Sequence, residues 1–250
     1  MIIYVYDGTF EGLLTAIYDS YYSKEEIDEI VRGKLYKPSF LYSPNYIQTN
    51  LVKFNKVKQA IIKKISKNSM LNIYYCFLAE TLNCDNLIYK YVKLGFTLGK
   101  DVDMHLHNDD VRKIHELKNK VSRESVRMLE FIRFKFVENS FYYAAIEPDY
   151  DILPLIAEHF TNRFSDQNFI INDMKREIAL VYNKDYWYIT ELKNKESEKL
   201  LNSKDVLAYE NLWKEYFKSI AIKERTNKKL QKNHMPSRYW KHILEMKDEL

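Results

Sequence analysis

Glycine, proline and cysteine are scarce in this chain, which has five Gly, five Pro and two Cys among 250 residues. The glycines are too dispersed to form a Walker loop or a dinucleotide-binding fingerprint. The motifs Gly-x-Ser-x-Gly and His-Glu-x-x-His are also missing, and two cysteines cannot form a three-cysteine cluster motif. Nucleotide-driven, serine-hydrolase and iron–sulfur mechanisms are therefore not expected within the chain, and no cofactor is predicted.

The two cysteines, Cys76 and Cys84, lie eight positions apart in an apolar segment with helical spacing. Two cysteines are too few for a disulfide framework, and this spacing does not match a zinc-binding pair. We therefore predict two buried, reduced thiols.

Long apolar runs are also missing. No stretch approaches the roughly 18 uncharged residues that a membrane-spanning helix needs. Residues 1–8 include neither a basic leader nor a small-residue cleavage site. We expect a cytoplasmic protein with no membrane partner.

Aromatic and apolar residues are abundant. Hydrophobic residues make up 46% of the chain, with 21 Tyr and 13 Phe, which is enough for a substantial core. The net charge of +4 is too small to indicate a nucleic-acid partner by itself, so the placement of the charges matters more.

Hydrophobic periodicity indicates the order of the secondary structure. The pattern predicts a strand at 2–6 followed by a helix, and then four amphipathic helices between 51 and 129. The period changes from about residue 131, where alternation at 133–136 followed by a turn and an apolar run at 141–146 predicts a hairpin. Beyond it, helical spacing predicts helices at 152–164 and 203–222, and short apolar runs predict strands at 169–171, 178–182 and 186–190.

This order predicts an α+β fold whose sheet is mostly antiparallel, with about five to six strands, a large helical insertion and a C-terminal helix. A single unit spanning 1–250 is expected, in which 1–22 and 131–190 share the core that contains the sheet. Residues 23–130 form the helical region, and 200–250 form the C-terminal helix and basic tail. Ser23 and Glu26 match a capping box that predicts a short second helix, and 33–49 is expected to be irregular.

A basic block near the C-terminus is the first candidate site. Residues 221–242 contain seven Lys or Arg residues and one acid, Glu224, with Tyr239 and Trp240 among the cations. Cations interleaved with aromatic rings suit phosphate contacts and base stacking. The alternative is a solvated surface with one buried aromatic anchor.

A second basic run lies on a predicted helix at Lys53, Lys56, Lys58, Lys63, Lys64 and Lys67. The lysines spread around more than one helical face. The run is therefore interpreted as a solvated helix in preference to a track for phosphates.

Two acidic groups are further candidates. Asp101, Asp103, His105, His107, Asp109, Asp110 and His115 are metal-ligand types in a polar turn before a helix, but acids at a helix start need no metal, and no metal site is predicted. The weak catalytic candidates are Glu147, Asp149, His159 and Asp173, which have side chains suited to acid–base chemistry. For Asp149 the alternative is capping of the next helix.

Several ordered motifs carry a resemblance to a known family. They are Tyr6-Asp7-Gly8-Thr9-Phe10-Glu11-Gly12-Leu13-Leu14, 127–134, Ile146-Glu147-Pro148-Asp149, His159-Phe160, Arg163-Phe164, Leu212-Trp213, Tyr216-Phe217, Ser219-Ile220-Ala221-Ile222, Glu224-Arg225-x-Asn227 and Met235-Pro236-x-Arg238-Tyr239-Trp240. This set resembles a bacterial family of uncharacterised proteins assigned to DNA metabolism or DNA repair. Members of that family accompany a radical-SAM protein or are fused to a uracil-DNA glycosylase-like domain. One difference is Val126, where relatives often carry His before the position of Arg127.

The resemblance implies a DNA-linked role but brings no catalytic residues. The leading hypothesis is an accessory protein that binds nucleic acid, DNA in particular, and works with a radical-SAM partner. Its predicted contacts are Arg225, Lys228, Lys229, Lys232, Arg238, Arg127 and Arg133, with Trp240 stacking on a base or anchoring the block. The alternatives are a protein-binding scaffold for that partner and a nuclease, lyase or glycosylase-type enzyme acting on DNA.

Overall fold

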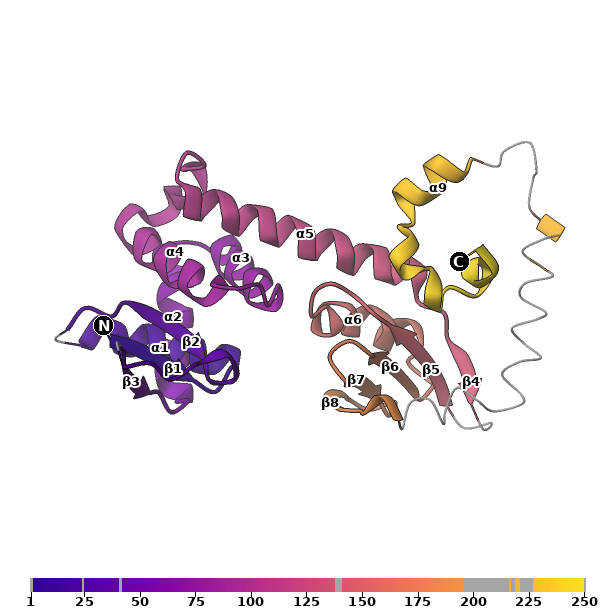
Figure 1. Cartoon of the computed structure of the whole chain (residues 1–250), viewed down its shortest axis with the longest axis horizontal. Coiled ribbons are helices and arrows are strands. Elements are labelled where there is room, and N and C mark those ends of the chain that lie inside the picture. Colours follow the sequence, from indigo (N-terminus) through magenta and orange to yellow (C-terminus); the bar gives the residue numbers. More distant parts are fainter. Residues whose placement is uncertain are drawn as a thin grey trace. The chain divides into compact units, whose positions relative to one another are not determined.

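The computed structural model describes residues 2–23, 25–40, 42–137, 141–195, 216, 219–220 and 227–249. The chain divides into two compact units, Met1–Ser122 and Arg123–Leu250 (Figure 1). The boundary falls within helix α5 (Asp109–Phe131). The sequence pattern predicts one continuous unit, whereas the structure has these two.

The first unit contains a parallel three-stranded sheet. Strand β1 (Ile2–Tyr6) lies between β2 (Glu29–Arg32) and β3 (Ser43–Tyr46). The expectation that β1 joins the antiparallel sheet is therefore wrong. Four of its five residues are buried, as in a central parallel strand covered on both faces.

The segment between β1 and the long helices also differs from the prediction. The capping-box helix does not form, because the chain after Ser23 extends into β2, which pairs with β1. The Ser23 hydroxyl instead accepts a hydrogen bond from the Glu25 amide at 3.2 Å. Strand β3 contains Pro44, which is tolerated because β3 is an edge strand.

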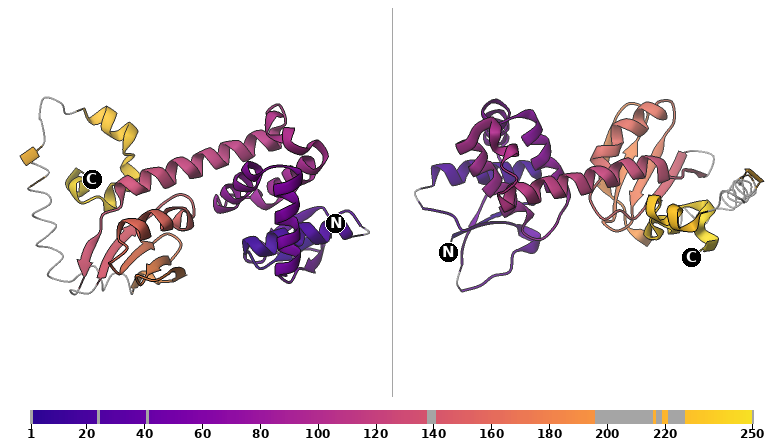
Figure 2. Two further views of the ribbon diagram at one scale, coloured as in Figure 1. Left: turned by 180° about the vertical axis from the view of Figure 1, so that it is seen from behind. Right: turned by 90° about the horizontal axis from the view of Figure 1, so that it is seen from above.

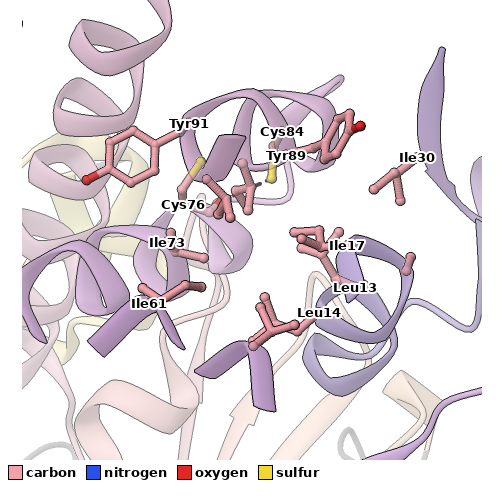
Figure 3. Close-up of a cluster of buried hydrophobic side chains, with 14 of the residues drawn as sticks. Leu13, Leu14, Ile17, Ile30, Ile61, Ile73, Cys76, Cys84, Tyr89 and Tyr91 are labelled. Atoms are coloured by element: carbon pink, nitrogen blue, oxygen red, sulfur yellow. Dashed lines mark hydrogen bonds between the residues drawn. The ribbon is translucent and has the colours of Figure 1, made fainter. Parts of the chain in front are cut away.

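Four helices and the start of α5 complete the first unit. They are α1 (Phe10–Tyr22), α2 (Leu51–Lys64), α3 (Lys67–Leu78) and α4 (Cys84–Leu98), with short 3-10 turns η1 (Gly33–Leu35) and η2 (Gly99–Met104). Their apolar faces form one core, in which Leu13, Ile61 and Ile73 are fully buried (Figure 3). Cys76 and Cys84 belong to this core as free thiols, as predicted.

The second unit is built on a five-stranded sheet. Its strands are β4 (Lys135–Val137), β5 (Phe141–Ile146), β6 (Phe169–Asp173), β7 (Ile178–Tyr182) and β8 (Trp187–Glu191), in the order β4-β5-β6-β7-β8. Only the β5–β6 pair is parallel. The chain crosses between those two strands through helix α6 (Leu153–Arg163). Together with the helical region, this sheet confirms the predicted α+β class.

Aromatic side chains join α6 to the sheet. The ring of Phe134 lies 5.4 Å from Phe160 and 5.0 Å from Phe164 on or just after α6, and 5.7 Å from Phe169 on β6. Figure 2 shows α6 against the sheet from two further directions. This edge-to-face packing fixes the crossover, and with it the loop that follows β5.

The described C-terminal residues form α9 (Lys228–His234) and two 3-10 segments, η4 (Ser237–His242) and η5 (Leu244–Glu249). The predicted helix at 203–222 lies largely outside the described residues.

In the part of the chain that the structure describes, none of the helices combines the length and the apolar character needed to cross a membrane.

Candidate functional site

Three of the predicted acidic residues lie together at one end of the second unit's sheet, where strands β5 and β6 finish. Glu147 and Asp149 follow β5, and Asp173 ends β6, the parallel neighbour of β5. Parallel neighbouring strands have their carboxyl ends on the same side of the sheet, so the β5–β6 pairing brings these residues together. Arg176 links them, since its guanidinium donates to Asp173 Oδ2 at 2.9 Å and to the Asp149 carbonyl at 2.8 Å.

The basic C-terminal block packs against this end of the sheet. Lys241 Nζ lies 2.5 Å from Glu147 Oε1, and His242 Nε2 lies 3.2 Å from the same oxygen. Arg238 Nη2 lies 3.0 Å from Asp149 Oδ2. The acidic loop and the basic block, which are about 90 residues apart in sequence, therefore offset one another's charge.

Glu124 on α5 is the buried centre of this cluster. Its side chain is 3% exposed and accepts hydrogen bonds from the Asp149 amide at 2.9 Å, the Tyr150 amide at 2.8 Å and the Tyr239 hydroxyl at 2.5 Å. Burial and the Glu124 carboxylate both raise the pKa of Tyr239, so its phenol stays protonated and keeps donating. One carboxylate thus ties together α5, the loop after β5 and η4.

The two aromatic residues of the basic block point inward. Tyr239 and Trp240 are each 3% exposed. Trp240 Nε1 donates to the Met235 carbonyl at 2.9 Å, and the Tyr239 ring lies 5.9 Å from Phe131. Of the two roles considered for Trp240, the structure favours the anchor, because a ring this deeply buried presents no free face to a base.

Two of the predicted arginines are also engaged in the fold. Arg238 lies over the Tyr239 ring at 4.6 Å, in addition to its pairing with Asp149. Arg133 donates to Glu245 Oε1 at 2.7 Å and so fastens η5. Arg127 is half-buried on α5, and Arg225 lies outside the described residues.

The three predicted lysines are exposed on α9. Lys228, Lys229 and Lys232 lie on this short helix, and residues 227–244 contain no acid. Lys229 and Lys232 make no ion pair with the described residues, although Lys232 Nζ lies 5.8 Å from the centre of the Trp240 ring. Gln231 Nε2 contacts Met246 Sδ at 3.3 Å, which holds α9 against η5.

His159 does not join the acidic cluster. It is exposed on α6, and its ring lies 5.1 Å from that of Phe160. Among the described contacts, none brings this imidazole to Glu147, Asp149 or Asp173. A general acid–base pair involving His159 therefore has no support in the geometry.

The Asp/His cluster of the first unit forms a hydrogen-bond network around Asp103. Its carboxylate accepts from Tyr91 Oη at 2.6 Å, His115 Nε2 at 2.9 Å and Ser69 Oγ at 3.0 Å. Burial and Asp103 raise the pKa of Tyr91. Within the described ranges, no three His, Cys, Asp or Glu side chains are grouped as metal ligands.

Sequence reasoning missed Glu124 and Arg176, although both organise the site. The available signal was Glu124 itself, a carboxylate on the same helical face as Val121 and Met128, which are buried. A buried acid at a core position of an amphipathic helix needs hydrogen-bond donors, and here they are two loop amides and a tyrosine.

Lowering the pH should weaken the contact between Glu147 and η4. Burial alone raises the pKa of this carboxyl, but the hydrogen bond from Lys241 and the charges of His242 and Lys241 outweigh it, and the net pKa is lowered. A lowered folded-state pKa gives stability that is present above the unfolded value, about 4.3, and lost as the pH falls below it.

The test is the free energy of unfolding between about pH 3 and pH 6. Glu147→Gln should show a shallower loss on acidification than the wild type. The test compares the two proteins with each other because Asp173 is present in both. Burial raises the pKa of Asp173, so its contribution to stability increases as the pH falls, opposite to that of Glu147. If the free energy of unfolding of both proteins falls equally between about pH 6 and pH 3, Glu147 does not hold η4.

A family described as a domain of unknown function (DUF4130) matches residues 83–245, which is more than half of the chain. No curated protein and no solved structure matches.

Proposed function

The chain belongs to the DUF4130 family, and we propose that it is an accessory protein of DNA metabolism or repair that binds nucleic acid and works with a radical-SAM partner. The observation that carries the nucleic-acid part is the exposed set of lysines on α9, in a segment without acids. The DNA-linked setting and the partner come from the ordered motifs described above, which include Met235-Pro236 and Arg238-Tyr239-Trp240.

The distribution of charge in the second unit supports this proposal. The nearby acids Glu147 and Asp149 are occupied by Lys241 and Arg238. Their negative charge is therefore locally neutralised, which lowers the electrostatic cost of bringing a phosphate near α9. Lys229 and Lys232 remain exposed for such contacts.

The same ion pairs favour binding over catalysis. A general acid must carry a proton, whereas Glu147 is held as a carboxylate by Lys241 and His242. A general base must reach the substrate, whereas Glu147 Oε1 already contacts both cations. Asp173 is buried and bonded to Arg176. Their geometry suits an electrostatic clasp that fixes the basic block.

The double variant Lys229→Gln/Lys232→Gln should bind DNA more weakly and with less salt dependence. If each lysine contacts one phosphate, the slope of log K against log salt should fall by roughly 1.4–1.8. Fluorescence anisotropy with a labelled oligonucleotide over a range of salt concentrations measures this slope.

The matched control is Lys34→Gln/Lys37→Gln, which removes two exposed lysines from the first unit. It should change the slope much less than the α9 variant. Equal slopes for the wild type and the α9 variant would remove α9 as the interface. A wild-type protein that binds no DNA or RNA at low salt would end the proposal for the isolated chain.

A further inference from the structure

The first unit has an aromatic cavity that the proposed function does not use. It has a volume of about 310 Å³ and is lined by residues of α1, α2 and α4. The cartoon shows where these three helices lie within the first unit (Figure 1). The side chains that give it its chemistry are four aromatic rings and two lysines: Tyr18, Tyr21, Tyr22, Phe96, Lys56 and Lys64.

The rings form two pairs. Tyr18 and Tyr22 stack at 4.6 Å with an interplanar angle of 30°, and Tyr21 meets Phe96 edge to face at 5.7 Å. Tyr22 is 74% exposed and Tyr21 is 47% exposed. Large aromatic side chains left this open suit a ligand that stacks on them.

The floor of the cavity comes from α2. Val57 and Ala60 lie between the two lysines in sequence and face the same hollow. Alanine at position 60 leaves space where a larger side chain would fill it. A cavity of about 310 Å³ lies at the lower limit of small-ligand pockets and suits one flat ring system.

The lysines place positive charge on this aromatic lining. Lys56 Nζ lies 5.7 Å from the centre of the Tyr18 ring, and Lys64 Nζ lies 5.9 Å from that of Phe96. They are eight residues apart, which is about 12 Å along a helix. Both side chains are exposed, so they are accessible to an anionic ligand.

The surrounding sequence strengthens this charge. No acid occurs between Glu29 and Glu80, a segment that contains nine Lys or Arg residues. Two of these are neutralised, Arg32 by Asp85 and Lys53 by Asp19. The ligand expected from such a surface carries negative charge and a flat aromatic part.

We propose that this cavity binds a base of single-stranded nucleic acid by stacking, with Lys56 and Lys64 contacting the flanking phosphates. The inference rests on the proposed function for the choice of nucleic acid, but it concerns a different unit and different residues. Stacking on aromatic rings requires an unpaired base, so the site selects single strands over duplex.

The variant Tyr22→Leu in the full chain should bind a single-stranded oligonucleotide roughly 5- to 150-fold more weakly. Anisotropy measures affinity, and an oligonucleotide containing 2-aminopurine reports stacking through quenching of its fluorescence. The wild type should quench the probe, and the variant should quench it much less. An abasic oligomer of equal length should bind the wild type more weakly than the normal strand.

Tyr46→Leu is the matched control, because Tyr46 is 67% exposed on β3 and does not line this cavity. It should bind the single strand like the wild type. Lys56→Gln/Lys64→Gln should lower the salt slope by roughly 0.7 for each phosphate that these side chains no longer neutralise.

The outcomes separate the two proposals. Weaker binding by Tyr22→Leu with unchanged binding by Lys229→Gln/Lys232→Gln supports base binding in the cavity and rules out α9 as a nucleic-acid contact. The reverse result overturns the cavity and leaves α9 in place. Equal affinity for normal and abasic strands also overturns the cavity, and so does a wild-type protein that binds no oligonucleotide, which would point to an acidic protein partner.

Discussion

Glu124→Ala is expected to lower the free energy of unfolding of the second unit by about 3–5 kcal/mol. The side chain is 3% exposed and accepts three hydrogen bonds. Removing it leaves the Asp149 and Tyr150 amides and the Tyr239 hydroxyl without their acceptor. The buried Tyr239 hydroxyl and the two partly buried amides that lose their acceptor account for most of this cost.

Denaturant unfolding followed by tryptophan fluorescence measures this change selectively, because all three Trp residues belong to the second unit. Hydrogen exchange adds a local readout, since the amides of Asp149 and Tyr150 should lose protection. The matched control is Glu130→Ala on the same helix, an exposed position where the change should be within about 0.5 kcal/mol. Similar losses for the two variants would contradict the role of Glu124.

The same variant connects stability to binding. Glu124 holds Tyr239 on η4, and η4 continues from the segment that carries α9. If η4 is released, the lysines of α9 lose their fixed position relative to the sheet. Glu124→Ala should therefore also weaken DNA binding under conditions where the protein remains folded, whereas Glu130→Ala should not.

Arg32→Leu is expected to cost the first unit about 3–5 kcal/mol. Arg32 on β2 donates through Nε to Asp85 Oδ2 at 3.1 Å and through Nη2 to the Phe77 carbonyl at 3.1 Å. Its guanidinium also lies 4.5 Å from the centre of the Phe77 ring. The variant leaves Asp85, which is 6% exposed, as a buried carboxylate without its cation.

Far-UV circular dichroism during denaturant unfolding measures this loss, and tryptophan fluorescence should report an unchanged second unit. The double variant Arg32→Leu/Asp85→Leu should recover part of the stability, because it leaves no unpaired charge behind. Arg112→Leu breaks an exposed pair with Asp109 and should cost less than about 1 kcal/mol. A double variant less stable than Arg32→Leu would show that packing, and not the buried charge, dominates at this position.

Local sequence pattern predicted most individual elements correctly. Short apolar runs rich in aromatic and β-branched residues located β5 and β7, and helical spacing located α4 and α6. Burial of Cys76 and Cys84 followed from their apolar surroundings. These features depend on neighbours along the chain, which a sequence shows directly.

The pairing of strands was harder to predict. Strand β1 was assigned to the wrong sheet because an apolar strand carries no mark of its neighbours. Strands β2 and β3 were missed because each has only four residues and shows no clear alternation. The capping-box residues Ser23 and Glu26 also match a helix start, but pairing of the next residues with β1 outweighs that local preference. Tertiary contacts, not propensity, decided this region.

The basic block shows the same division. The sequence by itself determined that residues 221–242 are rich in cations, that Tyr239 and Trp240 lie among them, and that Glu147 and Asp149 follow a strand. Only the tertiary structure decided that Arg238 and Lys241 are held by those acids while Lys229 and Lys232 remain exposed. The placement of charge along a chain is fixed by its sequence, whereas the availability of that charge depends on which opposite charges folding brings within a few ångströms.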